Sequence, residues 1–496
     1  MASAALVDQW SQPLWRLNNL YTIRDKGGNA IPFRTNWAQE KFFEDMWFLN
    51  LILKARQLGF TTAIQLYMLD NCLFNSNTAA GVIAHNREDA EAFFDDKIKF
   101  AYDRLPLGLL DRLGATQDSA KSLAFANNSK IRVGTSLRSG TFQLLHVSEF
   151  GKVCAKYPDK AKEIVTGAFN TVEAGQFIFV ESTAEGNSGD FHDMCDKAQK
   201  DEKEGRQLTK LDFKFHFYAW WQDPSYKLDD EDTAATLITP DDAKYFASVE
   251  AIIGVKLSQN QRAWYVKKRQ TQKAGMKREY PSTPQEAFEA SVEGAYFVTE
   301  MTKVREQGRI CKVPILNKPV DIFWDLGVGD AMALSFRQIV GSEVRWVDYY
   351  ENSGEGFEHY ARVLNEKGYI YGRHYFPHDG DTRSLGAVAK TKREWAIEAG
   401  IRPVEIVARI PTEAAGIEAS RAYLPSCWFD EERCQRLIQC LDSYRKEWDD
   451  KRGTWKDTAR HDEFSHGYKS FETAAVAPRS QASKPIDLTR INRGVV

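Results

Sequence analysis

The sequence has few cysteines, and they form no pattern. Seven cysteines are spread over 496 residues, at positions 72, 154, 195, 311, 427, 434 and 440. No two of them form a CxxC pair, and no histidine lies at zinc-like spacing from two of them. This odd, dispersed set argues against a disulfide framework or a zinc site, and it is typical of small buried side chains in a reducing compartment.

Long apolar runs and a strong excess of either charge are also missing. The best apolar run, residues 46–53, is broken by Asn50 and falls short of the about 18 residues that a membrane span needs. The start of the chain lacks the basic segment of a signal peptide. The net charge is −3, which is unlike a nucleic-acid coat protein but compatible with acidic sites beside local basic patches. We therefore expect a cytoplasmic protein without membrane association.

The spacing of apolar residues predicts a doubly wound α/β domain over residues 1–220. Strand-like runs alternate with helical patterns, which indicates a mainly parallel sheet. Residues 122–133 resemble an inserted hairpin. A helix is expected at about 36–50, and others at 87–104 and 158–173. The strands are expected at 50–54, 81–85, 142–148, 176–182 and 212–219.

The rest of the chain predicts a linker, a second α/β unit and a tail. Residues 221–294 are acidic and helical, with a capping-box start at Ser258 and Gln261. Residues 295–475 favour an RNase H-like sheet, because antiparallel strands joined by short turns precede a shorter strand and helices. Residues 476–496 are poor in apolar side chains, so we expect a mobile tail. In the second unit, strands are expected at 320–325, 331–338, 343–350 and 373–378, and helices at 356–367 and 431–450.

A degenerate phosphate-binding loop follows the first buried strand, in the run from Lys54 to Thr62. Such a loop needs backbone amides at a helix N-terminus and a nearby cation. Gly59 permits the tight turn, and Thr61 or Thr62 offers a hydroxyl to Mg²⁺. Phe60 stands where the usual lysine would be.

The missing lysine has two possible replacements at the start of the loop. Either Lys54 or Arg56 can supply the cation, and the residues alone do not decide between them. Gln57 lies between them and the glycine, and it joins the expected nucleotide-binding set.

A second motif supports a nucleotide-hydrolysing site. The apolar run 144–147 ends in Ser148 and Glu149, which places the acid at the carboxyl end of a buried strand, where parallel sheets bind ligands. Glu149 is expected to polarise the attacking water. Ser148 stands where an aspartate usually completes the magnesium shell. After the next strand, Ser182 and Thr183 are candidates for sensing the γ-phosphate.

Two further residues fit the same chemistry. Arg138 is a candidate arginine finger for a neighbouring subunit, which would stabilise the charge on the transferring phosphoryl group. Gln39, close to Trp37, is a candidate for reading the adenine edge. Both also fit bland roles, a surface arginine and a polar residue at a helix start.

Three acids in the second half predict a metal-dependent nuclease. Asp325 ends an apolar strand, Asp379 follows another, and Asp462 precedes a helix. Several carboxylates that converge on divalent ions cleave phosphodiesters, and oxygen ligands suit Mg²⁺ or Mn²⁺. Asp330 is expected to support the site. Glu463 is the alternative to Asp462 as the third ligand.

Taken together, these motifs resemble the large terminase subunit of tailed bacteriophages over roughly residues 30–475. The resemblance rests on their order: the Gln39 segment, a phosphate loop with its basic residue upstream, the strand ending in Glu149, and the Ser182 segment. The run 278–288, Arg-Glu-Tyr-Pro-Ser-Thr-Pro-Gln-Glu-Ala-Phe, and the three acids continue it. It implies an ASCE-type P-loop ATPase joined to an RNase H-like nuclease, with ATP and Mg²⁺ as cofactors.

The resemblance also implies a setting. Such a protein translocates double-stranded DNA into a procapsid and cuts concatemeric DNA. Its partners would be the portal protein, the procapsid, a small terminase subunit and further copies of itself in a ring, as a pentamer on the portal. It would work in the host cell cytoplasm, transiently docked on the procapsid.

Two other hypotheses fit parts of the sequence. One is an RNase H-like recombinase or transposase with a regulatory ATPase, although no helix-turn-helix signature for an end-binding domain is present. The other is a catalytically silent assembly or docking protein, which Phe60 and Ser148 favour and which intact Glu149, Asp325 and Asp379 oppose.

Overall fold

The computed structural model describes residues 9–186, 189–289, 294–327, 331–382, 390–449 and 454–478. By its internal contacts the chain divides into two compact units, Met1–Glu293 and Gly294–Val496. The predictions for Asp330 and for the tail beyond residue 478 lie outside the described residues.

The first unit is built on an eight-stranded sheet in the order β10-β3-β9-β8-β4-β7-β6-β5. The six strands from β10 to β7 run parallel, and β6 and β5 follow antiparallel. The predicted strands and the predicted hairpin are thus confirmed. The strands are β3 (Leu49–Lys54), β4 (Ala79–Ile83), β5 (Ala115–Ser119), β6 (Ser122–Phe125), β7 (Lys130–Gly134), β8 (Phe142–Ser148), β9 (Val172–Ser182) and β10 (Phe213–Tyr218).

Both faces of this sheet are covered by helices, because its central strands are apolar on both sides. All six residues of β3 are buried, as expected for a parallel strand between two helical layers. One core cluster contains Ile52 and α4, and the other contains Leu51, Leu53, α8 and α10. The helices are α2 (Pro13–Leu20), α3 (Trp37–Glu44), α4 (Phe60–Phe74), α5 (Arg87–Phe93), α6 (Phe100–Tyr102), α7 (Leu107–Leu110), α8 (Phe150–Lys156), α9 (Pro158–Glu163) and α10 (Asp190–Lys203).

The strand order brings three strand ends together. β9 lies between β3 and β8 and is parallel to both, which is the arrangement of the predicted P-loop sheet with an additional strand. The carboxyl ends of β3, β8 and β9 therefore share one edge, where the segments after Lys54, Ser148 and Ser182 begin.

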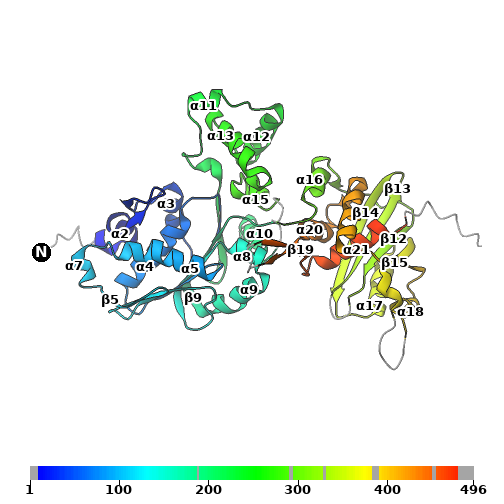
Figure 1. Ribbon diagram of the computed structural model, residues 1–496, viewed down its shortest axis with the longest axis horizontal. Coiled ribbons are helices and arrows are strands. Elements are labelled where there is room, and N and C mark those ends of the chain that lie inside the picture. The colour runs from blue at the N-terminus through cyan, green and yellow to red at the C-terminus, as the bar shows by residue number, and fades with distance from the viewer. Residues whose placement is uncertain are drawn as a thin grey trace, which may run out of the picture. The chain divides into compact units, whose positions relative to one another are not determined.

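Five further helices complete the unit, as the acidic region predicted. The predicted capping box at the start of α13 is present, with Ser258 and Gln261 bonded reciprocally. α11, α12 and α13 stand together to one side of the sheet (Figure 1). Their bounds are α11 (Asp230–Ala234), α12 (Pro240–Ile253), α13 (Gln259–Gln272), α14 (Met276–Glu279) and α15 (Pro284–Glu289).

The second unit contains a seven-stranded sheet in the order β11-β17-β14-β13-β12-β15-β16. β12, β13 and β14 are antiparallel to one another, and β15 and β16 continue parallel to β12. This is the predicted RNase H-like arrangement. The strands are β11 (Ile310–Cys311), β12 (Val320–Asp325), β13 (Ala331–Val340), β14 (Glu343–Ser353), β15 (Tyr371–Phe376), β16 (Val404–Ile406) and β17 (Cys427–Asp430).

Helices cover both faces of the second sheet. Phe323 and Trp346 face one core cluster, and Trp324 and Val347 face the other. Successive strand residues thus alternate between the two cores. The helices are α16 (Val298–Glu306), α17 (Phe357–Lys367), α18 (Lys392–Glu398), α19 (Glu413–Tyr423), α20 (Gln435–Ser443) and α21 (Ser465–Val476).

The predicted helix over 431–450 is wrong in its second half. α20 ends at Ser443, and β18 (Lys446–Asp449) pairs with β19 (Thr454–Ala459) as an antiparallel hairpin. The apolar spacing of a helix stops at Leu441. Beyond it, Trp448 packs edge-on against Trp455 across the hairpin, with ring centroids 4.9 Å apart.

No helix in the described part of the chain combines the length and the apolar character that a membrane span requires. The seven cysteines are all unpaired, and six of them are buried. This agrees with the interpretation of the cysteines as small core residues.

Candidate functional site

The loop between β3 and α4 has an unusual backbone that a neighbouring glutamine holds in place. Gln57 and Gly59 have positive φ angles of 65° and 73°. The Gln39 amide nitrogen donates to the carbonyl oxygens of Gly59 (3.0 Å) and Leu58 (3.3 Å). A Cβ atom at position 59 would lie 2.6 Å from that nitrogen, so only glycine fits there.

The predicted ligand residue Gln39 is therefore occupied with the loop itself. Its amide oxygen accepts the backbone N–H of Asn36 at 3.1 Å, which closes the capping box of α3. The Gln57 side chain instead accepts from Lys26 at the surface, at 2.8 Å. In this structure Gln39 shapes the loop and Gln57 faces outward.

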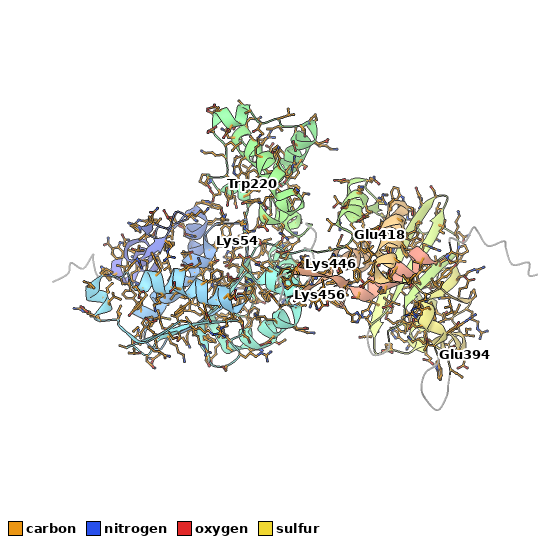
Figure 2. The ribbon with its side chains drawn as sticks, viewed as in Figure 1. Lys54, Trp220, Glu394, Glu418, Lys446 and Lys456 are labelled. Atoms are coloured by element: carbon orange, nitrogen blue, oxygen red, sulfur yellow. The ribbon has the colours of Figure 1, made fainter. Side chains whose placement is uncertain are left out.

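A buried cluster of charge lies at the shared strand edge. The Lys54 side chain is 7% exposed, and its Nζ lies 3.3 Å from Glu149 Oε1 and 3.0 Å from Glu181 Oε2 (Lys54 is labelled in Figure 2). Burial lowers the pKa of Lys54, but the two carboxylates outweigh it and raise the pKa above its ordinary value. Burial raises the pKa of Glu181, yet Lys54 holds that pKa below its ordinary value. The ion pairs are thus charged.

The sequence-based interpretation missed Glu181. Its side chain is fully buried, and its Oε1 accepts hydrogen bonds from the hydroxyls of Thr61 (2.7 Å) and Ser148 (2.8 Å). The available signal was a single acid at the end of the apolar run 177–180. The prediction assigned importance to the residues after this acid and overlooked the acid itself.

The other candidate cation, Arg56, has a different environment. Its guanidinium is 57% exposed and donates to Glu279 Oε2 at 2.6 Å, while its backbone N–H donates to the Glu279 carbonyl at 2.9 Å. The adjacent Arg278 donates to Glu185 at 3.0 Å. Lys54 therefore lies with the acids of the site, whereas Arg56 ties the loop to the end of α14.

Glu149 occupies a strained position between β8 and α8. Its backbone is left-handed, with φ 53° and ψ 45°, a conformation that is unfavourable for a non-glycine residue and is often found at functional sites. Just behind it, the Gly151 N–H donates to Ser182 Oγ at 3.0 Å. A Cβ atom at position 151 would lie 2.8 Å from the Thr183 carbonyl. The predicted segment of Ser182 and Thr183 thus abuts the turn that carries Glu149.

Two predicted residues remain apart from this cluster or make no distinctive contact. Thr62 lies in the first turn of α4 and is half-buried. Arg138 is 60% exposed and forms an ion pair with Glu163 of α9, rather than with any residue around Lys54.

The donors at this edge fit a nucleoside triphosphate with Mg²⁺. The N-terminus of the 15-residue α4 offers its free N–H groups and positive dipole end to phosphate. Lys54 adds a cation, and the hydroxyl and carboxylate oxygens of Thr61 and Glu181 are the hard ligands that Mg²⁺ prefers.

In the second unit, Asp325 and Asp379 lie at the ends of adjacent parallel strands. β12 and β15 pair with Phe323 opposite Tyr375, so both acids follow the same sheet edge. The Lys392 ammonium bridges them indirectly, at 2.6 Å from Asp379 Oδ2 and 3.1 Å from the Leu326 carbonyl oxygen. A cation of this chain thus lies at the predicted acidic edge.

The structure places His466, and not Asp462, beside Asp325. His466 Nδ1 lies 2.9 Å from Asp325 Oδ2. Asp462 accepts the Phe464 N–H at 3.1 Å, and its other oxygen faces Arg460 at 3.5 Å and Arg445 at 3.8 Å. Burial raises the pKa of Asp462. The predicted third ligand therefore supports the start of α21 from a separate position.

The predicted metal trio is not assembled in the described residues. Among them, no three side chains of His, Cys, Asp or Glu gather closely enough to hold a metal ion. Segments 328–330 and 383–389, which follow Asp325 and precede Lys392, lie outside the described part. The observed donors thus do not by themselves fit a metal ion.

Comparison with known proteins gave structural likenesses only. No family model and no curated protein matches the sequence. The fold is similar to the crystal structure of the bacteriophage HK97 large terminase, with a TM-score of 0.43 and 13% identity over 94% of this chain and 98% of that chain. For the large terminase of a thermophilic bacteriophage, the values are 0.34 and 11%, over 89% of this chain and 98% of that chain.

A single-domain structure is also similar. The large terminase ATPase domain of Thermus phage P74-26 gives a TM-score of 0.32 and 13% identity, over 50% of this chain and 94% of that chain. Sequence identities this low leave the function of this chain to be argued from its own side chains.

Proposed function

We propose that this chain is a large terminase subunit, an ATP-driven translocase of double-stranded DNA that also cuts DNA. The observation that carries the proposal is the buried Lys54 ammonium between Glu149 and Glu181, beside the loop and the N-terminus of α4. A charged lysine with two acids at the end of a parallel sheet is an arrangement suited to phosphate chemistry.

Each residue of this cluster has a role in the proposed hydrolysis. When bound, Mg²⁺ neutralises charge on the phosphate oxygens. Lys54 neutralises further charge from the β3 side. Glu149, whose carboxylate is 31% exposed, orients the attacking water and accepts its proton. The left-handed backbone at Glu149 aims the side chain away from the buried strand, toward the open edge.

The hydrogen bond between Gly151 and Ser182 offers a route from hydrolysis to movement. It joins the turn that carries Glu149 to the segment after β9. That segment continues to Glu185, which is bonded to Arg278 beside α14. A change at Glu149 would therefore reach the helical subdomain through a short chain of direct contacts.

The DNA-cutting half of the proposal rests on Asp325, Asp379 and His466. Asp325 and Asp379 share a sheet edge, and His466 reaches Asp325 from α21. Mg²⁺ or Mn²⁺ as the nuclease cofactor remains part of the proposal, as does two-metal cleavage.

The proposal also includes assembly partners. In it, copies of the chain form a ring, as a pentamer, on a portal protein of a procapsid in the host cytoplasm, and a small terminase subunit supplies DNA recognition. Arg138 is exposed on the loop after β7, a position compatible with the predicted arginine finger toward a neighbouring subunit.

Hydrolysis of ATP by the purified full chain tests the motor. We expect Mg²⁺-dependent release of phosphate that Glu149→Gln lowers by about 10²-fold or more, because the base that positions water is lost. Asp457→Asn, at a carboxylate fully exposed in the second unit, is the matched control and retains the wild-type rate. Equal rates for wild type and Glu149→Gln would contradict the motor assignment.

Incubation with plasmid DNA tests the nuclease. Wild-type protein with Mg²⁺ or Mn²⁺ should convert supercoiled plasmid to nicked and linear forms, and Asp325→Asn should not. Cleavage by both proteins at the same rate would exclude the proposed site.

A further inference from the structure

The end of β8 lacks a group that the proposed chemistry needs. Ser148 stands where a carboxylate would complete the magnesium shell of the nucleotide, and a serine carries no charge. Its hydroxyl donates to Glu181 on the adjacent strand at 2.8 Å. The register explains this contact, because Ser148 lies directly opposite Glu181 across the β8–β9 ladder, and side chains opposite each other in a sheet share a face.

The same carboxylate meets the phosphate loop. Glu181 is also in register with Ile52 of β3, so it occupies the strand between the two motifs. Its Oε1 accepts the Thr61 hydroxyl at 2.7 Å, and Thr61 is the loop residue expected to place its hydroxyl on Mg²⁺. Two hydroxyls, one from each motif, thus converge on one oxygen atom of Glu181.

We propose that Glu181 is the magnesium-shell carboxylate of the nucleotide site, moved from the end of β8 to the adjacent strand β9. The inference deepens the proposed ATPase function and rests on it. In it, Thr61 and Glu181 form the protein part of the Mg²⁺ site, and Ser148 positions Glu181 by its hydrogen bond.

A second observation supports a ligand at this position. His146, two residues before Ser148 on the same face of β8, is fully buried, and neither of its ring nitrogens has a hydrogen-bond partner in the described residues. Its Nε2 lies 3.5 Å from Glu181 Oε1. A buried polar group without a partner is unfavourable. A hydrated cation at Glu181 would provide the water that such a group requires.

The charges make a distinctive prediction. Lys54, Glu149 and Glu181 sum to one negative charge, so the buried carboxylate repels a metal-free triphosphate. A divalent cation between them converts this repulsion into attraction. Glu181 should therefore make ATP binding depend strongly on Mg²⁺, with a coupling in the usual range of about 5- to 150-fold.

The test measures the affinity of the full chain for a fluorescent ATP analogue, in Mg²⁺ and in EDTA. Wild type should bind more tightly in Mg²⁺, by about tenfold or more. Glu181→Gln keeps the size of the side chain and removes its charge. It should bind the metal-free analogue more tightly than wild type and lose the Mg²⁺ enhancement. A merely structural role for the Lys54–Glu181 pair would weaken binding equally in both conditions, and that result would overturn the proposal.

A rescue variant guards against misfolding of Glu181→Gln. The double variant Ser148→Asp/Glu181→Gln returns a carboxylate to the end of β8, opposite the original position. It should recover the Mg²⁺ enhancement, and electron paramagnetic resonance should show Mn²⁺ bound in the presence of the analogue. Absence of rescue in a protein with a wild-type circular dichroism spectrum would overturn the assignment.

Glu149→Gln is the control for charge, since it removes the other carboxylate on Lys54. It should keep the Mg²⁺ enhancement even though hydrolysis is lost. Wild-type protein that binds no analogue in either condition would overturn the proposed ATPase function itself. Wild-type binding with an unchanged enhancement in Glu181→Gln would overturn only the role of Glu181.

Discussion

Two basic residues begin the phosphate loop, and their surroundings differ in kind. Lys54 is buried between two acids, whereas Arg56 is mostly exposed and held by Glu279. We expect Lys54→Met to lower ATP hydrolysis by about 10²-fold or more, because a preorganised charge near the phosphates is lost. Arg56→Met should lower it by less than about tenfold. Steady-state phosphate release measures both, and the reverse order would assign the loop cation to Arg56.

The same contrast between two neighbours exists in the second unit. His466 contacts Asp325, whereas Asp462 bonds to the start of α21. His466→Ala should slow plasmid cleavage by about 10- to 100-fold, as expected when a partner of a site carboxylate is removed. Asp462→Ala should instead lower the free energy of unfolding by about 1.5–3 kcal/mol, since a hydrogen bond to a charged group is lost. Cleavage rates and urea unfolding distinguish these roles, and the converse pattern would restore Asp462 as the ligand.

The residues found by sequence and those missed differ in what identifies them. Glu149 and Asp325 end apolar strands, so a buried charge at a strand end marks them in the sequence. Glu181 has the same mark, but its meaning depends on the order of strands in the sheet. Only the placement of β9 between β3 and β8 shows that its acid meets Thr61 and Ser148. Contacts across strands are invisible in a pattern along the chain.

At the level of elements, a buried ion pair anchors the helix that follows the loop. Asp70 of α4 is fully buried and accepts from Arg16 of α2 (2.6 Å) and from the Tyr21 hydroxyl (2.9 Å). Asp70→Ala leaves the Arg16 charge buried and unpaired, so the free energy of unfolding should fall by about 3–5 kcal/mol.

A surface pair provides the comparison for Asp70. Asp96 bonds to Arg24, and both side chains are nearly half exposed. Asp96→Ala should change the free energy of unfolding by at most about 1 kcal/mol. Urea unfolding followed by circular dichroism measures both variants. Similar losses for the two would mean that the buried pair does not anchor α4.

A buried histidine on β10 predicts how stability changes with pH. Burial lowers the pKa of His216 to about 4, from an ordinary value of 6.5. Between these values the unfolded chain binds a proton that the folded chain does not. The free energy of unfolding should therefore fall as the pH decreases from 6.5 toward 4. His216→Gln should show a shallower decrease in urea unfolding at several pH values. Parallel curves for the two proteins would exclude His216 as a source of the dependence.

The sequence predicted regular elements well wherever apolar spacing was continuous. β8 and β12 have the predicted bounds, 142–148 and 320–325. The hairpin of β18 and β19 was predicted as helix, because charged residues between Ser443 and Asp449 suit an exposed helix as well as an exposed strand. Its conformation follows from pairing with residues farther along the chain, which a local pattern does not contain.

At the scale of the whole molecule, each unit has its own core. Two hydrophobic clusters lie within residues 17–288 and two within residues 296–477. Both units have the size of independent domains. We expect residues 1–293 and 294–496, expressed separately, to fold and to retain ATP binding and plasmid cleavage, respectively.

Calorimetry of the full chain provides the second measurement of this independence. Asp70→Ala should lower the temperature of one unfolding transition and leave the other unchanged. A single transition that shifts as a whole, or fragments without a cooperative transition, would mean that the units depend on each other for folding.

The left-handed backbone of Glu149 sets chemistry against conformational preference. Glycine or asparagine would adopt φ 53° more readily, so a glutamate there lowers the stability of the fold. Selection for stability alone would remove the acid, and its retention therefore requires selection for activity. Position 149 is thus a place where a lineage that lost the reaction would drift first. A change to glycine there would mark a chain that has kept the architecture and abandoned the work.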